Sequence, residues 1–205
     1  MAERRRVGIM GGTFDPIHMG HLILGESAWD EFHLEKVLFM PSGNPPHKVG
    51  RKGAANEQRT EMVRLAVEDN PHFELSLEEM YESGYIYTKK TLRRLRIANP
   101  DTDYYFIMGA DSLLAFDTWN GPQEICDQCT LVAAVRDLMP MEELDREIAR
   151  LRDKYHADIR KLHTPNLDIS SHTIREWARC GRSIRYYVPE KVMDYILESG
   201  VYGEL

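Results

Sequence analysis

The residues with the clearest chemical potential lie in the segment 11–21, which reads Gly-Gly-Thr-Phe-Asp-Pro-Ile-His-Met-Gly-His. Gly11 and Gly12 allow the backbone to approach a ligand closely and to present its N–H groups. His18 and His21 lie three residues apart where a helix is expected to begin, so their imidazoles should share one face. The N-terminus of a helix favours anions, and two imidazoles add hydrogen-bond donors. The segment therefore predicts a phosphate-binding site.

Other interpretations of this segment stay open at this point. The glycines alone could form an ordinary turn, and the histidines could be core residues or half of a zinc site. No third zinc ligand stands nearby, so we expect no metal ligated by the protein here. The segment has neither the Gly-Lys-Ser/Thr of a Walker loop nor the Gly-x-Gly-x-x-Gly of a dinucleotide-binding turn.

A second candidate site lies near the other end of the chain, in the segment 169–175, Ile-Ser-Ser-His-Thr-Ile-Arg. Ser170 or Ser171 can cap a helix, and Arg175 then lies one turn further on. Hydroxyl groups, backbone N–H groups and a guanidinium would converge there on a phosphate. Taken without the first segment, a capped helix with an exposed arginine would be the better interpretation.

The composition of the chain excludes some classes of partner. The chain has 205 residues, and its 42% hydrophobic and 29% charged residues are typical of a soluble globular protein of one domain, residues 1–205. The net charge of −7 argues against broad binding to nucleic acid or to anionic membranes. No apolar run is long enough to cross a bilayer or to serve as a signal peptide, so we expect a cytoplasmic protein.

Three cysteines are present, Cys126, Cys129 and Cys180, and this odd, sparse set fits reduced thiols. The spacing of Cys126 and Cys129 matches half of a metal or redox motif. No second pair completes a zinc site, so we expect both thiols to be inert.

Strands and helices are expected to alternate along the chain and to position these residues. Short apolar runs predict strands at 7–10, 37–40, 73–77, 104–108, 131–135 and 159–162. Helices are expected over 22–32, 56–68 (capped by Asn56), 88–98, from 112, and over 122–128, 141–155, 171–180 and 189–199. This alternation predicts an α/β fold, a Rossmann-like doubly wound parallel sheet with helices on both faces and a small C-terminal helical portion. Ligands bind such sheets beyond the carboxyl ends of the strands.

The two segments together resemble the HxGH nucleotidyltransferase superfamily, and within it the nicotinate mononucleotide adenylyltransferases of bacteria. The resemblance covers nearly the whole chain. Further matches are Pro-Pro-His-Lys at 45–48, Tyr87-Thr88 before a helix, Gly-Ala-Asp-Ser at 109–112, Trp119, Arg136 and the closing segment 188–202. Lys89 and Lys90 depart from the pattern, which has apolar or smaller residues after Tyr-Thr.

The resemblance implies transfer of AMP from ATP to nicotinate mononucleotide, giving nicotinate adenine dinucleotide and pyrophosphate in NAD biosynthesis. The acceptor phosphate has a second pKa of about 6, so it is mostly ionised at neutral pH and needs no general base. It would attack the α-phosphorus of ATP in line, and catalysis would depend on positioning and charge stabilisation. Mg2+ is the implied cofactor, bound mainly by ATP oxygens and water.

The resemblance also implies roles for individual residues. His18, His21 and Arg175 would be catalytic, stabilising charge on the ATP phosphates. The implied ATP contacts are Gly11, Gly12, Thr13, His18, His21, Gly109, Asp111, Ser170, Ser171 and Arg175. The implied contacts of nicotinate mononucleotide are His47, Lys48, Thr88, Trp119, Asn120 and Arg136. Asp111 would accept from ribose hydroxyls, although it could also cap the next helix. Trp119 would stack on the pyridine ring, although it could also be a core residue.

Alternative functions remain at this point. A superfamily member could instead use nicotinamide mononucleotide, pantetheine phosphate or a cytidylyl substrate, but Trp119 and Tyr87-Thr88 favour a pyridine nucleotide. A catalytically silent nucleotide-binding regulator should lack a histidine or the arginine, and here all are present. A role linked to RNA is disfavoured by the acidic balance and the short chain. The sequence neither requires nor excludes a homo-oligomer.

Overall fold

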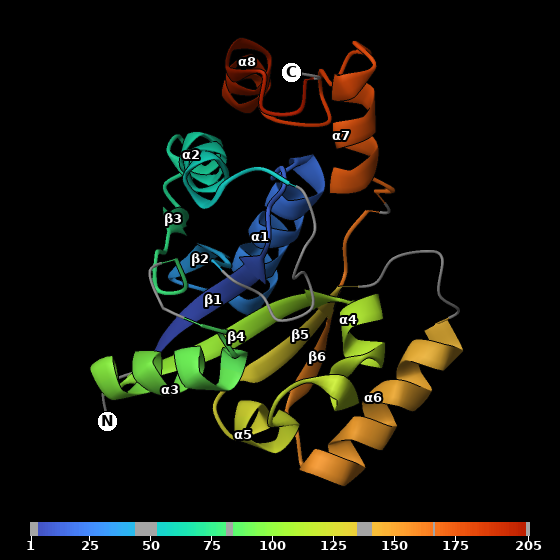
Figure 1. The fold of residues 1–205 in the computed structure, drawn as a ribbon. Coiled ribbons are helices and arrows are strands. Elements are labelled where there is room, and N and C mark those ends of the chain that lie inside the picture. The colour runs from blue at the N-terminus through green and yellow to red at the C-terminus, as the bar shows by residue number, and fades with distance from the viewer. Residues whose placement is uncertain (1–3, 44–52, 81–83, 135–140, 166, 204–205) are drawn as a thin grey trace.

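The computed structural model describes residues 4–43, 53–80, 84–134, 141–165 and 167–203. They form one sheet whose six strands have the order β3-β2-β1-β4-β5-β6, and every neighbouring pair is parallel. The strands are β1 (Arg5–Gly12), β2 (Lys36–Pro41), β3 (Phe73–Leu75), β4 (Thr102–Gly109), β5 (Thr130–Ala134) and β6 (Ile159–Leu162). Figure 1 shows this sheet with helices on both of its faces. The predicted doubly wound, Rossmann-like α/β fold is confirmed.

Each face of the sheet is covered by its own group of helices. Along β2, Val37 and Phe39 contribute to one hydrophobic core, and Leu38 and Met40 contribute to the other, as the period of a strand requires. The first core is closed by α1 (Met19–Phe32), α2 (Asn56–Val67), α7 (Ser171–Arg179) and α8 (Glu190–Ser199). The second core is closed by α3 (Thr88–Ala98), α4 (Ala110–Leu114), α5 (Pro122–Cys126) and α6 (Met141–Tyr155), with the short 3-10 helix η2 (Phe116–Thr118).

The last two helices form the small C-terminal portion that the sequence predicts. Figure 1 shows α7 and α8 beyond the sheet, with α8 beside α2. Gly200 ends α8 in the left-handed conformation at φ 61°, which glycine adopts without strain. Within the described residues, no helix is long and apolar enough to span a membrane.

Most element boundaries agree with the sequence pattern within two residues, and the differences have physical causes. β3 ends at Leu75, because the chain then turns and the Met80 N–H donates to the Leu77 carbonyl at 3.0 Å. The expectation that Asn56 caps α2 was wrong. Ala55 is the N-cap, and its N–H donates to the Gln58 side chain at 2.9 Å. The Asn56 oxygen instead accepts from the Arg59 guanidinium at 2.5 Å.

Candidate active site

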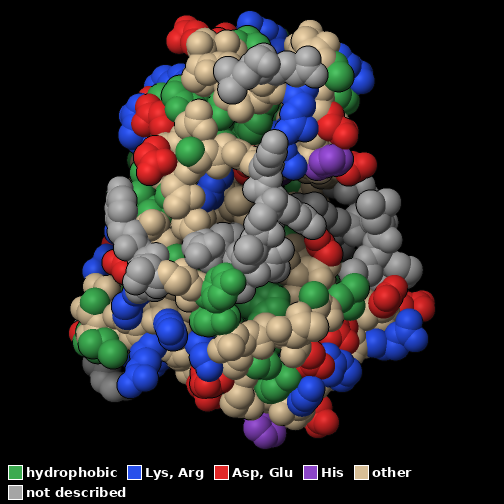
Figure 2. Space-filling model, viewed as in Figure 1, with side chains coloured by type: hydrophobic (Ala, Val, Ile, Leu, Met, Phe, Trp, Pro, Cys, Tyr) green, Lys and Arg blue, Asp and Glu red, His purple; other side chains and the backbone are tan. Residues whose placement is uncertain are grey.

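A pocket opens where the order of the strands reverses. β1 lies between β2 and β4, so its carboxyl end is the switch point at which such sheets bind ligands. The pocket has a volume of about 980 Å³, and its lining includes Gly11, Gly12, Thr13, His21, Gly109, Asp111, Thr88, Trp119 and Asn120. In Figure 2, hydrophobic side chains lie in the middle of this face, and charged side chains gather along its lower margin. The switch point thus brings together most of the predicted site residues.

The two histidines of the segment 11–21 share one face, as their spacing predicts. Their rings stack with centroids 3.7 Å apart. The backbone N–H of His18 donates to Nδ1 of His21 at 3.2 Å. His21 lines the pocket, whereas the His18 side chain is 3% exposed. Because Nδ1 of His21 accepts, a neutral ring carries its proton on Nε2. His21 therefore has a donor nitrogen on the side away from its own helix backbone.

The segment 169–175 lies against the segment 11–21, so the two predicted phosphate sites are neighbours. Ser170 is the N-cap of α7, and its Oγ accepts from the Thr173 N–H at 3.1 Å. The Ser171 hydroxyl donates to the Pro16 carbonyl at 2.9 Å. Arg175 Nη1 donates to the Asp15 carbonyl at 2.5 Å. The capped start of α7 is thus fastened to the turn between β1 and α1.

Asp15 organises this junction, a role that was not predicted from the sequence. Its Oδ1 accepts from the Tyr202 hydroxyl at 2.7 Å and from the Ala54 N–H at 3.2 Å. Its Oδ2 lies 3.8 Å from Nη1 of Arg175. Burial and the charge of Asp15 raise the pKa of Tyr202, so the phenol stays protonated and continues to donate. The carboxylate between glycines and histidines was the available signal, but nothing local pointed to Tyr202.

Arg59 is a second organising residue that the pattern did not reveal. It is 4% exposed and donates to the Thr13 carbonyl at 2.5 Å and to the Ser42 carbonyl at 2.7 Å. Burial lowers its pKa, and the charge of Asp15 acts in the opposite direction. Arg59 therefore joins the turns that follow β1 and β2. An arginine on an amphipathic helix is normally read as solvent-exposed, which hid this role.

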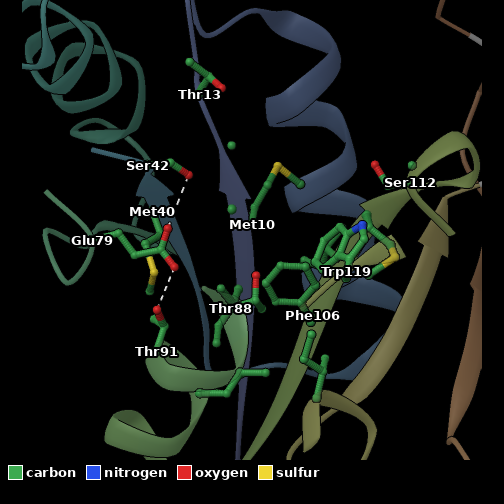
Figure 3. A pocket seen from close by; sticks show the side chains of 18 of the residues that line it. Met10, Thr13, Met40, Ser42, Glu79, Thr88, Thr91, Phe106, Ser112 and Trp119 are labelled. Atoms are coloured by element: carbon green, nitrogen blue, oxygen red, sulfur yellow. Dashed lines mark hydrogen bonds between the residues drawn. The ribbon is translucent and has the colours of Figure 1, made fainter. Parts of the chain in front are cut away.

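Aromatic rings form another wall of the pocket. Trp119 lies edge-on to Phe106 with centroids 5.9 Å apart and is tilted against Phe116 at 5.6 Å. Its side chain is only partly buried and also lines the pocket, so Trp119 is both a core contact and a pocket residue (Figure 3). Thr88 also lines the pocket and is the first residue of α3, after the N-cap Tyr87.

Asp111 lies in the first turn of α4 and lines the pocket. The alternative that it caps this helix is wrong, because the N-cap is Gly109 and no side chain caps that end. A Cβ on Gly109 would lie 2.9 Å from Oδ1 of Asp111. Gly109 thus leaves room for the carboxylate beside the end of β4.

Three predicted contacts cannot be placed. His47, Lys48 and Arg136 lie outside the described residues. Among the described residues, no group of three His, Cys, Asp or Glu side chains is arranged to hold a metal ion.

Burial raises the pKa of Cys126 to about 11 and also raises that of Cys129. Both thiols are therefore protonated at neutral pH, which agrees with the inert character expected for them.

A parallel sheet with the strand order β3-β2-β1-β4-β5-β6 defines the doubly wound α/β class, whose members bind nucleotides at the switch point. The family model described as cytidylyltransferase-like matches residues 9–177. A "Probable nicotinate-nucleotide adenylyltransferase" of Lachnoclostridium phytofermentans is 42% identical over 198 residues, which cover 97% of this chain and 99% of the relative. Its counterpart of the same name in Thermoanaerobacter sp. is 44% identical over 203 residues, covering 98% and 96%. The chain belongs to the cytidylyltransferase-like family, and within it to the nicotinate-nucleotide adenylyltransferases.

The fold agrees with that of a solved structure. The Plasmodium falciparum nicotinic acid mononucleotide adenylyltransferase complexed with APC superposes with a TM-score of 0.78 and covers 97% of each chain. Its sequence is 16% identical to this chain, so the similarity concerns the fold.

Proposed function

We propose that the chain transfers the adenylyl group of ATP to nicotinate mononucleotide, forming nicotinate adenine dinucleotide and releasing pyrophosphate in NAD biosynthesis. One observation carries this proposal: a single pocket at the switch point is lined by a phosphate loop, a carboxylate and an indole, contributed by Gly12, His21, Asp111 and Trp119. The curated relatives, which are named for this activity, support it. The whole chain, 1–205, would act as one nucleotidyltransferase domain.

The ATP phosphates would lie between the two joined segments. The N-terminus of α1 and the Nε2–H of His21 would face them from one side, and Ser170, Ser171 and Arg175 from the other. Gly11, Gly12 and Thr13 would contribute backbone N–H groups. His18, which is buried behind its stacked partner, would act through the orientation of His21 and through the start of α1. These groups stabilise charge that develops on the transferring and leaving phosphates.

No proton need be removed by the protein in this reaction. The acceptor phosphate is already ionised, with a second pKa of about 6, and attacks the α-phosphorus as the bond to pyrophosphate breaks. The role of the pocket is to align these atoms and to exclude water. Mg2+ fits as a companion of ATP, since this ion keeps several waters and binds phosphate oxygens, where it would neutralise negative charge.

The adenosine and the acceptor would take different walls of the pocket. Asp111, beside Gly109 at the end of β4, would accept from the ribose hydroxyls. Trp119 would stack on the positively charged pyridine ring. The nicotinate carboxylate would meet Thr88 at the N-terminus of α3 and backbone N–H groups near Asn120, where an anion is favoured. His47, Lys48 and Arg136 remain proposed contacts of the mononucleotide phosphate on the sequence resemblance alone.

The test is an acceptor comparison with pyrophosphate release as the readout. Nicotinate mononucleotide should exceed nicotinamide mononucleotide by at least about tenfold in kcat/KM, because the neutral amide loses the charge interaction with the α3 N-terminus. Pantetheine phosphate serves as the acceptor for the superfamily alternative. Equal rates with the two pyridine nucleotides would contradict the nicotinate preference. Release with pantetheine phosphate alone would contradict the proposed function.

A further inference from the structure

A buried carboxyl group lies in the wall of the pocket, and the mechanism above gives it no role. Glu79 is 8% exposed and lines the pocket between the end of β2 and the start of α3. Its Oε1 accepts from the Thr91 hydroxyl at 2.7 Å, and its Oε2 accepts from the Ser42 hydroxyl at 3.3 Å. Figure 3 shows both hydrogen bonds side by side, with Thr88 at the neighbouring edge of the pocket.

The two hydroxyl donors come from different elements of the pocket wall. Thr91 belongs to α3, and Ser42 belongs to the turn after β2. Thr91 is 1% exposed and lies three residues after Thr88 on α3, hence on the same face of that helix. Ser42 follows β2, and its N–H donates to the Gly12 carbonyl at 2.8 Å. Its own carbonyl accepts from Arg59 at 2.7 Å. Glu79 therefore links the first turn of α3 to the phosphate loop after β1.

The backbone of Glu79 is held as firmly as its side chain. The Gly43 N–H donates to the Glu79 carbonyl at 3.0 Å. A Cβ at Gly43 would lie 2.5 Å from that oxygen and 3.0 Å from the Met80 carbonyl. This close approach admits only glycine without a backbone shift, since real Cβ atoms do not come so near to a carbonyl. The position of the carboxyl group relative to the turn after β2 is therefore fixed.

A buried carboxyl group is energetically unfavourable in the wall of this pocket. Removing it from water costs free energy that two hydroxyl donors offset only in part. A leucine of similar size would fill the space without that cost, but it would accept from neither Thr91 nor Ser42. What the carboxyl adds is the connection between the two elements.

We propose that Glu79 is a positioning residue for the acceptor mononucleotide, holding the α3 N-terminus and Thr88 at a set distance from the phosphate loop. The inference rests on the proposed function, because it takes Thr88 as a contact of the nicotinate carboxylate. The acceptor must span this distance with its ring and its phosphate. A loosened α3 should weaken acceptor binding and leave the ATP side of the pocket in place.

The kinetic test compares Glu79→Ala and Glu79→Gln with a neighbouring control, Glu78→Ala. Glu78 is exposed and its Oε2 lies 3.8 Å from Arg94 Nε. Glu79→Ala should raise the KM for nicotinate mononucleotide about tenfold, as expected for losing hydrogen bonds to a charged group. The KM for ATP and kcat should stay within about twofold of wild type. Glu79→Gln should restore the acceptor KM, because its amide oxygen still accepts from Thr91.

A second variant keeps the test decisive if Glu79→Ala fails to fold. Thr91→Val removes the stronger donor with little change of shape and should raise the same KM. Combined with Glu79→Gln, it should cancel the rescue by Gln, because the two changes act on one hydrogen bond. An equal rise in both substrate KM values, or none in either, would overturn the proposal.

Hydrogen exchange separates this proposal from the proposed function. In the substrate-free protein, Glu79→Ala should speed exchange of the amides in the first turns of α3, and Glu78→Ala should not. Unchanged exchange in Glu79→Ala would overturn the positioning role, whatever the substrate. If the wild-type protein does not adenylylate nicotinate mononucleotide, the proposed function and the acceptor role fail. The exchange rates still decide whether Glu79 anchors α3.

Discussion

His21 is the residue on which the proposed chemistry depends most directly. Its ring stacks on His18, meets Phe14 edge-on at 5.0 Å and lines the pocket. We expect His21→Ala to lower kcat by about 100- to 1000-fold, because a positioned donor to the transition state is lost. The variant should still fold, since the ring is only partly buried. Pyrophosphate release and a thermal unfolding curve check both parts.

A matched control uses another histidine of the chain. His163 is exposed after β6, with Nδ1 3.1 Å from Glu31, and it does not belong to the pocket lining. His163→Ala should leave turnover unchanged. Turnover of His21→Ala close to that of His163→Ala would remove His21 from the mechanism.

Because Glu79 is buried, the free energy of unfolding of the protein should depend on pH. Burial is the largest influence and raises its pKa above the ordinary 4.5, while hydroxyl donors from Thr91 and Ser42 and the charge of Arg94 lower it in part. The folded protein therefore holds this proton more tightly than the unfolded chain. The stabilisation from the bound proton is complete below pH 4.5 and is lost as the pH rises through the folded pKa.

Glu79→Gln lacks this titration, so its melting temperature relative to wild type should increase between pH 4.5 and neutral pH. Thermal unfolding of both proteins across that range measures the difference, and Glu78→Gln controls for charge on the same turn. A difference that does not change with pH would contradict the raised pKa.

At the scale of elements, α2 carries two arginines with opposite environments. Arg59 is buried and donates to two carbonyls of the pocket turns, whereas Arg64 is exposed and pairs with Glu61 and Glu68. Arg59→Met should lower the free energy of unfolding by about 2–5 kcal/mol, because buried acceptors lose their donor. Arg64→Met should leave it nearly unchanged. Denaturant midpoints of the two variants test this, and equal losses would show that Arg59 is not a special link.

The elements that the sequence predicted best are those decided by local pattern. α3, α6 and β6 have the bounds that their apolar spacing predicts, because each buries one continuous face or run. The cap of α2 was wrongly assigned to Asn56, because its oxygen accepts from the Arg59 guanidinium one turn further along the helix and not from the backbone. Arg59 and Glu79 were missed for a different reason: they hydrogen-bond to partners far away in the sequence, Thr13 and Ser42. Periodicity carries no information about such partners.

The site was predictable where the fold itself brings residues together. The carboxyl ends of parallel strands meet at one edge of the sheet, so glycines and carboxylates after β1 and β4 had to be neighbours. Segments 11–21 and 169–175 were both predicted to bind phosphate, and in the structure Arg175 donates to the Asp15 carbonyl. The hydrogen bond that Tyr202 donates to Asp15 joins residues 187 positions apart. No spacing rule could have indicated it.

At the scale of the whole molecule, the segment that follows α8 packs back onto the turn between β1 and α1. The chain leaves α8 at Gly200, and Tyr202, 3% exposed, donates to the carboxylate of Asp15. The carbonyl of Asp15 in turn accepts from Arg175. Tyr202 thus helps to set the geometry of the proposed phosphate site between segments 11–21 and 169–175.

Tyr202→Phe keeps the ring in the core and removes only the hydroxyl. The free energy of unfolding should fall by about 1–2 kcal/mol, because the Asp15 carboxylate loses a donor in a partly buried site. The KM for ATP should rise severalfold, since Asp15 can then shift together with Arg175, and the acceptor KM should stay constant. Tyr186→Phe, whose side chain is 84% exposed, is the matched control. A loss of stability with an unchanged ATP KM would mean that the C-terminal closure supports the fold without setting the phosphate site.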